Sequence, residues 1–171
     1  MNFGDTLRSG QAGKAVSPQC KQFGESKASE LRSVHETTDV WELAAREGVT
    51  VRRSDWDGVD RLRLFGTYAD GVITLYDAQI PALSETLEIE ESLATELVLA
   101  HELGHHVLDA SELASKPRSP WRKMLSPWGS SAETERAIEE QATHWFALEL
   151  LGDRLPETAR RKLRRGVEDT T

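Results

Sequence analysis

The stretch Leu99-Ala100-His101-Glu102-Leu103-Gly104-His105-His106 dominates the interpretation of this chain, because it contains the pattern H-E-x-x-H. Apolar residues recur every three or four positions over about residues 88–109, which predicts a helix around it. On a helix, His101 and His105 lie one turn apart on one face, so two imidazole nitrogens can reach one metal ion. Glu102 lies about 100° around the axis, where its carboxylate can take a proton from a water molecule beside that ion.

Five letters are modest support for a metal site, and the alternative is that both histidines are ordinary core residues with their own hydrogen bonds. The context favours the site. Apolar neighbours on both sides, Leu97 to Leu99 and Val107 to Leu108, indicate a partly buried helix. His106 points to another face, and we expect it at the surface or behind the ligands.

A catalytic zinc ion needs a third protein ligand and an open position for water. No third histidine follows the motif at short range, so a second predicted helix, over about residues 133–151, is the candidate source. Glu140 shares a face of that helix with Ala147 and Leu151, so its carboxylate points inward, where an unpaired charge would be costly. A metal ion would neutralise it; a surface ion pair with an arginine is the alternative.

Three further side chains are candidates for a supporting role. His144, one turn after Glu140, could hydrogen-bond a metal ligand. A second donor to a developing oxyanion is also expected, and His144, Tyr68 and Tyr76 are unranked candidates for it.

Two features are expected to contact a substrate. The strand near residues 71–76 is expected to offer an edge to an extended peptide backbone. Trp121 and Trp128, in a Pro-rich connection, are expected either to form a lid or to pack beneath that connection.

The segment before the motif has the pattern of a small sheet. Val49 and Val51 alternate with polar residues, as in a half-buried strand. Two further runs, residues 61–66 and 72–76, flank Asp70-Gly71, and Asp-Gly favours a tight hairpin turn. Strands followed by long helices predict an α+β domain, with a small three-stranded sheet of antiparallel type packed on a helical core that contains the motif.

The chain is expected to divide into three parts. Residues 1–32 are rich in Gly, Ser, Lys and Gln and are expected to be a flexible leader. Residues 33–152 form the expected central domain, opening with a capping box at Ser33 and Glu36. Residues 153–171 are expected to be a basic C-terminal helix and tail.

Composition excludes several classes of function. The chain has 171 residues, 38% hydrophobic and 29% charged, which suits one globular domain. The 21 Lys+Arg against 29 Asp+Glu give a formal net charge of −8, which argues against direct nucleic-acid binding. No apolar run approaches the roughly 20 residues that cross a bilayer, and Cys20 alone forms no internal disulfide. We therefore expect a soluble cytoplasmic protein without a membrane attachment.

The chain resembles the ImmA/IrrE-type metallo-endopeptidases over about residues 40–152. The resemblance rests on Gly71-Val72-Ile73-Thr74-Leu75, on Ala100-His101-Glu102-Leu103-Gly104-His105, and on Glu140 ahead of Phe146-Ala147-Leu148-Glu149-Leu150-Leu151.

The resemblance implies a zincin-like core in which His101, His105 and Glu140 hold Zn²⁺ and Glu102 is the catalytic residue. Anchoring instead on Ala142, as in the family's usual Glu-x-x-Ala-Asn pattern, would place the third ligand on Glu139. Thr143-His144 stands where Ala-Asn is common in the family.

The activity that the resemblance implies is that of a zinc-dependent endopeptidase, which cleaves a helix-turn-helix transcriptional repressor or a similar regulatory protein. The alternative is a non-catalytic regulatory binding protein, in which a metal ion only ties two helices together. Its basic last helix would then dock an acidic partner.

Overall fold

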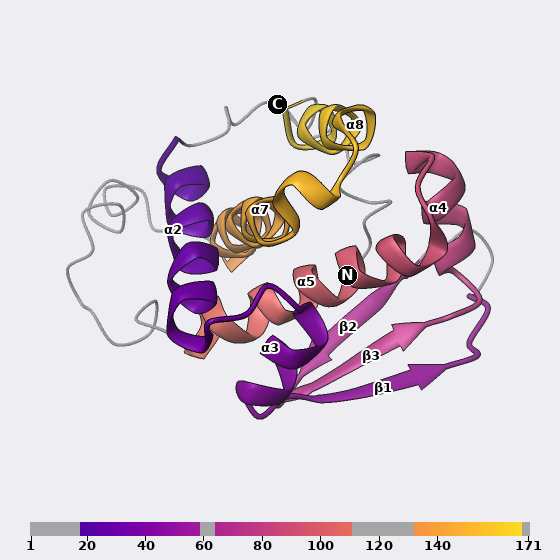
Figure 1. Ribbon diagram of the computed structural model, residues 1–171, viewed down its shortest axis with the longest axis horizontal. Helices are drawn as coiled ribbons and strands as arrows, with labels where there is room; N and C mark the ends of the chain where they lie inside the picture. The colour runs from indigo at the N-terminus through magenta and orange to yellow at the C-terminus, as the bar shows by residue number, and fades with distance from the viewer. Residues whose placement is uncertain (1–17, 59–63, 111–131, 169–171) are drawn as a thin grey trace.

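The computed structural model describes residues 18–58, 64–110 and 132–168, which form an α+β fold (Figure 1). The α+β class predicted from the sequence is therefore confirmed. In chain order the elements are α2 (Pro18–His35), α3 (Val40–Arg46), β1 (Thr50–Ser54), β2 (Gly66–Ala69), β3 (Val72–Tyr76), α4 (Ile80–Leu87), α5 (Glu91–Ala110), α7 (Ala132–Leu151), the short 3₁₀ helix η2 (Gly152–Arg154) and α8 (Glu157–Glu168).

The sheet is mixed, so the expectation of an antiparallel-type sheet is wrong. Its strand order is β1-β3-β2, with β2 antiparallel to β3 and β1 parallel to β3. Asp70 and Gly71 take the positive φ values, 48° and 78°, that a tight turn needs, and they force the antiparallel pair. The chain reverses direction between β1 and β2 and again at the Asp70-Gly71 turn. β1 and β3 therefore run in the same direction.

The strand at residues 72–76 has no free edge, which corrects a second expectation. β3 is the central strand and pairs with β1 on one side and β2 on the other. In the described sheet the outer strands are β1 and β2, and β2 is an outer strand that contacts α5. β2 also begins at Gly66, later than the predicted run; Leu64 and Phe65 precede it, and residues 61–63 lie outside the described residues.

Two layers of helices lie on one side of the sheet (Figure 1). α5 contacts β2 and β3, and α7 packs on α5 from the other side, flanked by α2 and α8. A helix enclosed in this way must be apolar all round. That position explains why the four consecutive residues Leu97, Val98, Leu99 and Ala100 are all buried.

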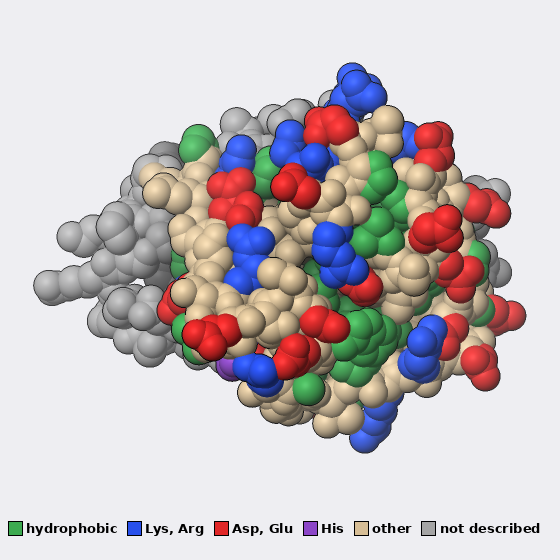
Figure 2. Space-filling model, in the orientation of Figure 1, with side chains coloured by type: hydrophobic (Ala, Val, Ile, Leu, Met, Phe, Trp, Pro, Cys, Tyr) green, Lys and Arg blue, Asp and Glu red, His purple; other side chains and the backbone are tan. Residues whose placement is uncertain are grey.

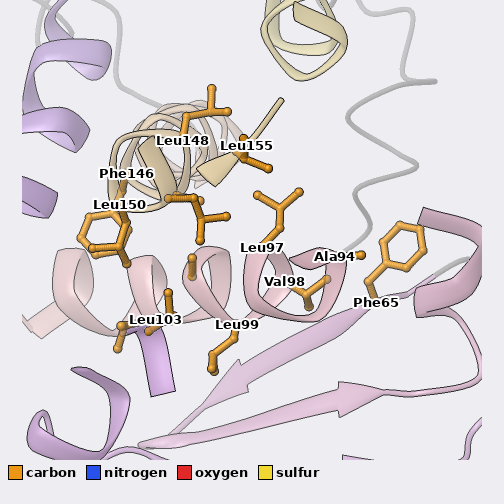
Figure 3. Packing of buried hydrophobic residues seen from close by; sticks show 14 of the residues in the cluster. Phe65, Ala94, Leu97, Val98, Leu99, Leu103, Phe146, Leu148, Leu150 and Leu155 are labelled. Atoms are coloured by element: carbon orange, nitrogen blue, oxygen red, sulfur yellow. The ribbon is translucent and has the colours of Figure 1, made fainter. Parts of the chain in front are cut away.

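The core fills the spaces on both sides of α5 (Figure 3). Leu97 points from α5 toward α7, whereas Leu99 points toward the sheet. Phe146, on α7, is fully buried. α8 adds Ala159 and Leu163 to the same core, so the C-terminal helix is an integral part of the fold and not an appendage.

Residues 18–32 are not a flexible leader, because they form most of α2. α2 packs along α7 and buries Cys20, Gly24, Ala28 and Leu31. Ser33 and Glu36 do not cap a new helix, since α2 continues through Ser33 and ends at His35. The next helix, α3, is capped instead by Asp39, whose carboxylate accepts the backbone N–H groups of Trp41 and Glu42. Residues 1–17 lie outside the described residues.

The Pro-rich connection with Trp121 and Trp128 also lies outside the described residues. Among the helices that are described, none has the length and apolar character needed to cross a membrane.

Gly24 lets α2 and α7 approach closely. A Cβ atom at Gly24 would lie 2.2 Å from the carbonyl oxygen of Ala142 and 2.9 Å from the backbone nitrogen of Phe146. Backbone atoms of a packed helix cannot move aside cheaply, so this contact excludes any side chain.

We expect Gly24→Ala to destabilise the protein although alanine is the better helix former. The propensity gain of about 1 kcal/mol is outweighed by an overpacking cost of roughly 1–3 kcal/mol or more. The midpoint of urea unfolding measures the difference. Ser26→Ala, at an exposed position of the same helix, is the control and should be neutral or slightly stabilising. An unchanged or higher midpoint for Gly24→Ala would contradict the packing of α2 on α7.

Candidate metal centre

Three side chains from two helices converge between α5 and α7. His101 and His105 project from one face of α5, with ring centroids 5.1 Å apart. Glu140 of α7 faces both: Oε1 lies 3.0 Å from His101 Nε2, and Oε2 lies 3.4 Å from His105 Nε2. One ligand atom from each residue lies within 4.8 Å of the other two, so this group could hold a metal ion.

Gly104 is what allows α7 to come close enough. A Cβ atom at Gly104 would lie 2.8 Å from Thr143 Cγ2 and 3.1 Å from Phe146 Cδ1. Both neighbours are fully buried on α7, so a side chain at position 104 would push the helices apart. Gly104, which lies inside the H-E-x-x-H motif, is therefore a packing residue. It brings α7 close enough for Glu140 to reach the two histidines.

The charges of the group are strongly coupled. Burial alone would raise the pKa of Glu140, but the charge of His101 and the close contacts with the imidazoles of His101 and His105 hold that pKa well below its ordinary value. Burial likewise opposes the charged form of His105, yet Glu139 and Glu140 outweigh it and raise the pKa of His105 to about 10. Positive charge beside Glu140 thus stabilises its ionised carboxylate, and a bound cation would also supply such a charge.

The donor atoms fit a metal ion. His105 Nε2 and Glu140 Oε2 are buried and lie 3.4 Å apart, and within the described part of the chain neither makes a hydrogen bond of good geometry. Buried polar atoms without good hydrogen bonds are costly, and a cation between them would satisfy both. Two imidazole nitrogens and one carboxylate oxygen form a set that divalent transition metals accept.

Glu139 does not share the position of Glu140. Its Oε1 lies 3.0 Å from Nδ1 of His105, on the far side of the ring from Glu140. Between the two residues left open by the sequence, the geometry therefore favours Glu140 as the one that joins the ligand group.

Glu102 is buried next to this group, with 3% of its surface exposed. Burial raises its pKa, more than the nearby His101 and His105 lower it. Glu102 is on the sheet side of α5. A Cβ atom at Gly66, the first residue of β2, would lie 3.2 Å from Glu102 Oε1 and 2.7 Å from Val98 Cγ1. The bare backbone of β2 at Gly66 thus leaves room for the carboxylate.

The supporting candidates fall in different places. His144 is buried on α7, where burial, followed by the charge of His101, lowers its pKa to about 4 despite a hydrogen bond with the backbone of Leu163. It is therefore a neutral imidazole at pH 7. Tyr68 contacts His106 instead: its hydroxyl lies 2.9 Å from His106 Nδ1 and accepts the N–H of Gly71 at 3.2 Å.

Tyr76 is a wrong candidate, because it lies on the opposite face of the sheet. Gly66 pairs with Leu75 and faces α5, so Leu75 shares that face and the next residue, Tyr76, points away from it. There the Tyr76 ring packs edge-on against Trp56, and its hydroxyl lies 3.3 Å from Thr67 Oγ1.

Sequence reasoning missed the parts played by Gly66 and Glu139. In the sequence, Gly66 is only the end of the predicted run over residues 61–66, and a glycine at a strand start gives no sign of which helix approaches it. The sequence offers Glu139 only as an alternative third ligand. The signal for a separate role is the Glu139-Glu140 doublet, because neighbouring residues of a helix point in different directions and so contact different atoms.

The centre is hidden from the face shown in Figure 2, where almost no histidine surface is visible and acidic and basic side chains are interspersed. Comparison with protein-family models, with curated proteins and with solved structures found no match for this chain. The centre is thus defined by its own geometry: an α+β fold with a buried histidine–carboxylate group that could hold a metal ion.

We expect Glu140→Ala to abolish stoichiometric metal binding, from about one ion per chain to about none, because two imidazoles alone leave the site short of a ligand. Metal analysis after dialysis against micromolar zinc measures the content. Glu149→Ala, on the same helix but paired with Arg32 near the surface, is the matched control and should keep its metal. Full metal content in Glu140→Ala would remove Glu140 from the ligand group.

Gly66→Ala should destabilise the fold by roughly 1–3 kcal/mol, because the new methyl group collides with Val98 and crowds Glu102. Urea unfolding measures the loss, and Thr67→Ala, on the other face of β2, is the control. Combining Gly66→Ala with Val98→Ala should cost less than the sum of the two single changes, since the second makes room for the first. Simple additivity would show that the contact is not what position 66 requires.

Proposed function

We propose that this chain is a zinc-dependent endopeptidase with a zincin-like core. The observation that supports this most directly is the convergence of His101, His105 and Glu140, with the buried Glu102 on the neighbouring position of the same helix. A site that only tied two helices together would have no use for a buried carboxylate beside the ligands, whose desolvation is costly. The resemblance to the ImmA/IrrE-type metallo-endopeptidases points the same way.

Zinc is the metal that this donor set suits best. His101 and His105 would each present Nε2, and Glu140 would present a carboxylate oxygen, which matches the two-histidine, one-carboxylate set of catalytic zinc sites. Manganese or iron could occupy the same ligands, so the purified protein's metal content is part of the test.

The chemistry that a bound zinc ion supplies is polarisation of a water molecule and of a peptide carbonyl. Glu102 would act as the general base: its carboxylate takes a proton from the attacking water and passes it to the leaving amine. The raised pKa of Glu102 suits this double role, because a group that releases its proton too readily is a poor acid in the second step. The enclosure of Glu102 between α5 and β2 keeps bulk water from competing.

The substrate would be a protein presented as an extended segment. The edge of β2, next to Glu102, would pair with its backbone, in place of the strand at residues 72–76 that the sequence suggested. Neutral His144 and Tyr68 remain the candidates for an oxyanion donor. By the same resemblance, a DNA-binding repressor or similar regulatory protein is the expected class of substrate.

We expect Glu102→Gln to keep about one zinc ion per chain and to lower the rate of peptide cleavage by roughly 10²–10⁴-fold, the usual worth of a general base. The assay follows fragments of a proteome-derived peptide mixture by mass spectrometry, with zinc-loaded protein and with protein treated with a chelator. Glu96→Gln, elsewhere on the same helix, is the control. Undiminished cleavage by Glu102→Gln would remove Glu102 from the mechanism.

The same assay separates a protease from a binding protein. Fragments that disappear with chelator and with Glu102→Gln support the protease. A stoichiometric complex with a regulatory protein, without fragments, would support the metal-stabilised binding protein instead and would overturn the proposed activity.

A further inference from the structure

Glu139 and Glu140 are consecutive residues of α7, yet they contact opposite nitrogens of one imidazole. Glu140 Oε2 lies 3.4 Å from Nε2 of His105, and Glu139 Oε1 lies 3.0 Å from Nδ1 of the same ring. The His105 side chain is 12% exposed and that of Glu139 is 34% exposed, so the second contact is partly shielded from water.

An imidazole that binds a metal through one nitrogen must carry its proton on the other. A carboxylate accepts hydrogen bonds and cannot donate them when ionised, so the contact with Glu139 requires a proton on Nδ1. When a metal ion displaces the other proton, that arrangement directs the Nε2 lone pair of His105 toward the centre of the ligand group.

We propose that Glu139 is a positioning residue, which holds the His105 ring in the tautomer and orientation that present Nε2 to the metal ion. This inference rests on the metal-binding part of the proposed function and is independent of peptide cleavage. Through its hydrogen bond to the ring, the negative charge of Glu139 also makes His105 a more basic ligand.

The contact differs from an ordinary surface ion pair. Glu149, ten residues after Glu139 on α7, pairs with the guanidinium of Arg32, which is a flexible partner with several donors. Glu139 instead contacts Nδ1 of the His105 ring, and Nε2 of the same ring belongs to the ligand group. The position of Glu139 therefore affects how His105 faces the metal ion. Glu149 is therefore the matched control.

We expect Glu139→Ala to bind one zinc ion per chain with roughly 10–100-fold lower affinity, the usual cost of losing such a partner. Glu139→Gln should lose less, because its amide oxygen still accepts the Nδ1 proton but without charge. Glu149→Ala should match the unmodified chain. Competition with a chromophoric zinc chelator, on the full-length protein, measures all four affinities.

A second measurement reports the hydrogen bond itself. In the zinc-loaded protein labelled with ¹⁵N-histidine, the Hδ1 proton of His105 should give a slowly exchanging, downfield resonance. The resonance should move upfield in Glu139→Gln and disappear by exchange in Glu139→Ala, while the Nε2 shift stays that of a coordinated nitrogen. A role in stability alone would not change the exchange of one ring proton.

Two results would overturn the inference. Equal zinc affinity in Glu139→Ala and Glu149→Ala would show that the contact does not position His105. Loss of stoichiometric zinc in Glu139→Ala, with retention in Glu140→Ala, would make Glu139 a ligand and not a positioning residue. The expected order of zinc affinities among the variants, without peptide cleavage by the unmodified chain, would instead overturn only the proposed activity.

Discussion

The close approach of α5 and α7 is the constraint on which the candidate centre depends. A carboxylate on a short side chain can reach two imidazoles on another helix only if the two backbones come near each other. Gly104 permits this, because no atom stands between its backbone and the buried side chains of Thr143 and Phe146. Gly104 lies between His101 and His105 in the sequence. The helix contact therefore occurs at the same turn of α5 that carries the two histidines.

Glycine plays this part at three places in the molecule. Gly24 allows α2 to pack closely on α7. Gly104 does the same for α7 on α5, and Gly66 for α5 on β2. In a helix, a glycine such as Gly24 or Gly104 costs about 1 kcal/mol relative to alanine. All three glycines allow one layer to lie close to the next, and the stacked layers bring Glu140, His101, His105 and Glu102 into one region.

Burial gives the centre its electrostatic character. Charged groups enclosed between layers are stabilised only by each other, so Glu140 remains ionised while burial favours the protonated form of Glu102. Two carboxylates on adjacent elements thus have opposite tendencies. Such a division is compatible with the roles proposed above, in which Glu140 would hold a cation and Glu102 would exchange a proton.

Periodicity and spacing in the sequence determined the α+β class, the helices around residues 91–110 and 132–151, the Asp70-Gly71 hairpin and the shared face of His101 and His105. These features depend on near neighbours in the chain, and local geometry specifies them. The tertiary structure decided which element meets which face. It made β1 parallel to β3, packed residues 18–35 on α7, turned Tyr76 away from α5 and gave Glu139 and Glu140 different nitrogens of His105. Those outcomes follow from the contact of segments distant in the chain, where a periodic pattern shows that a side chain is buried but not what lies against it.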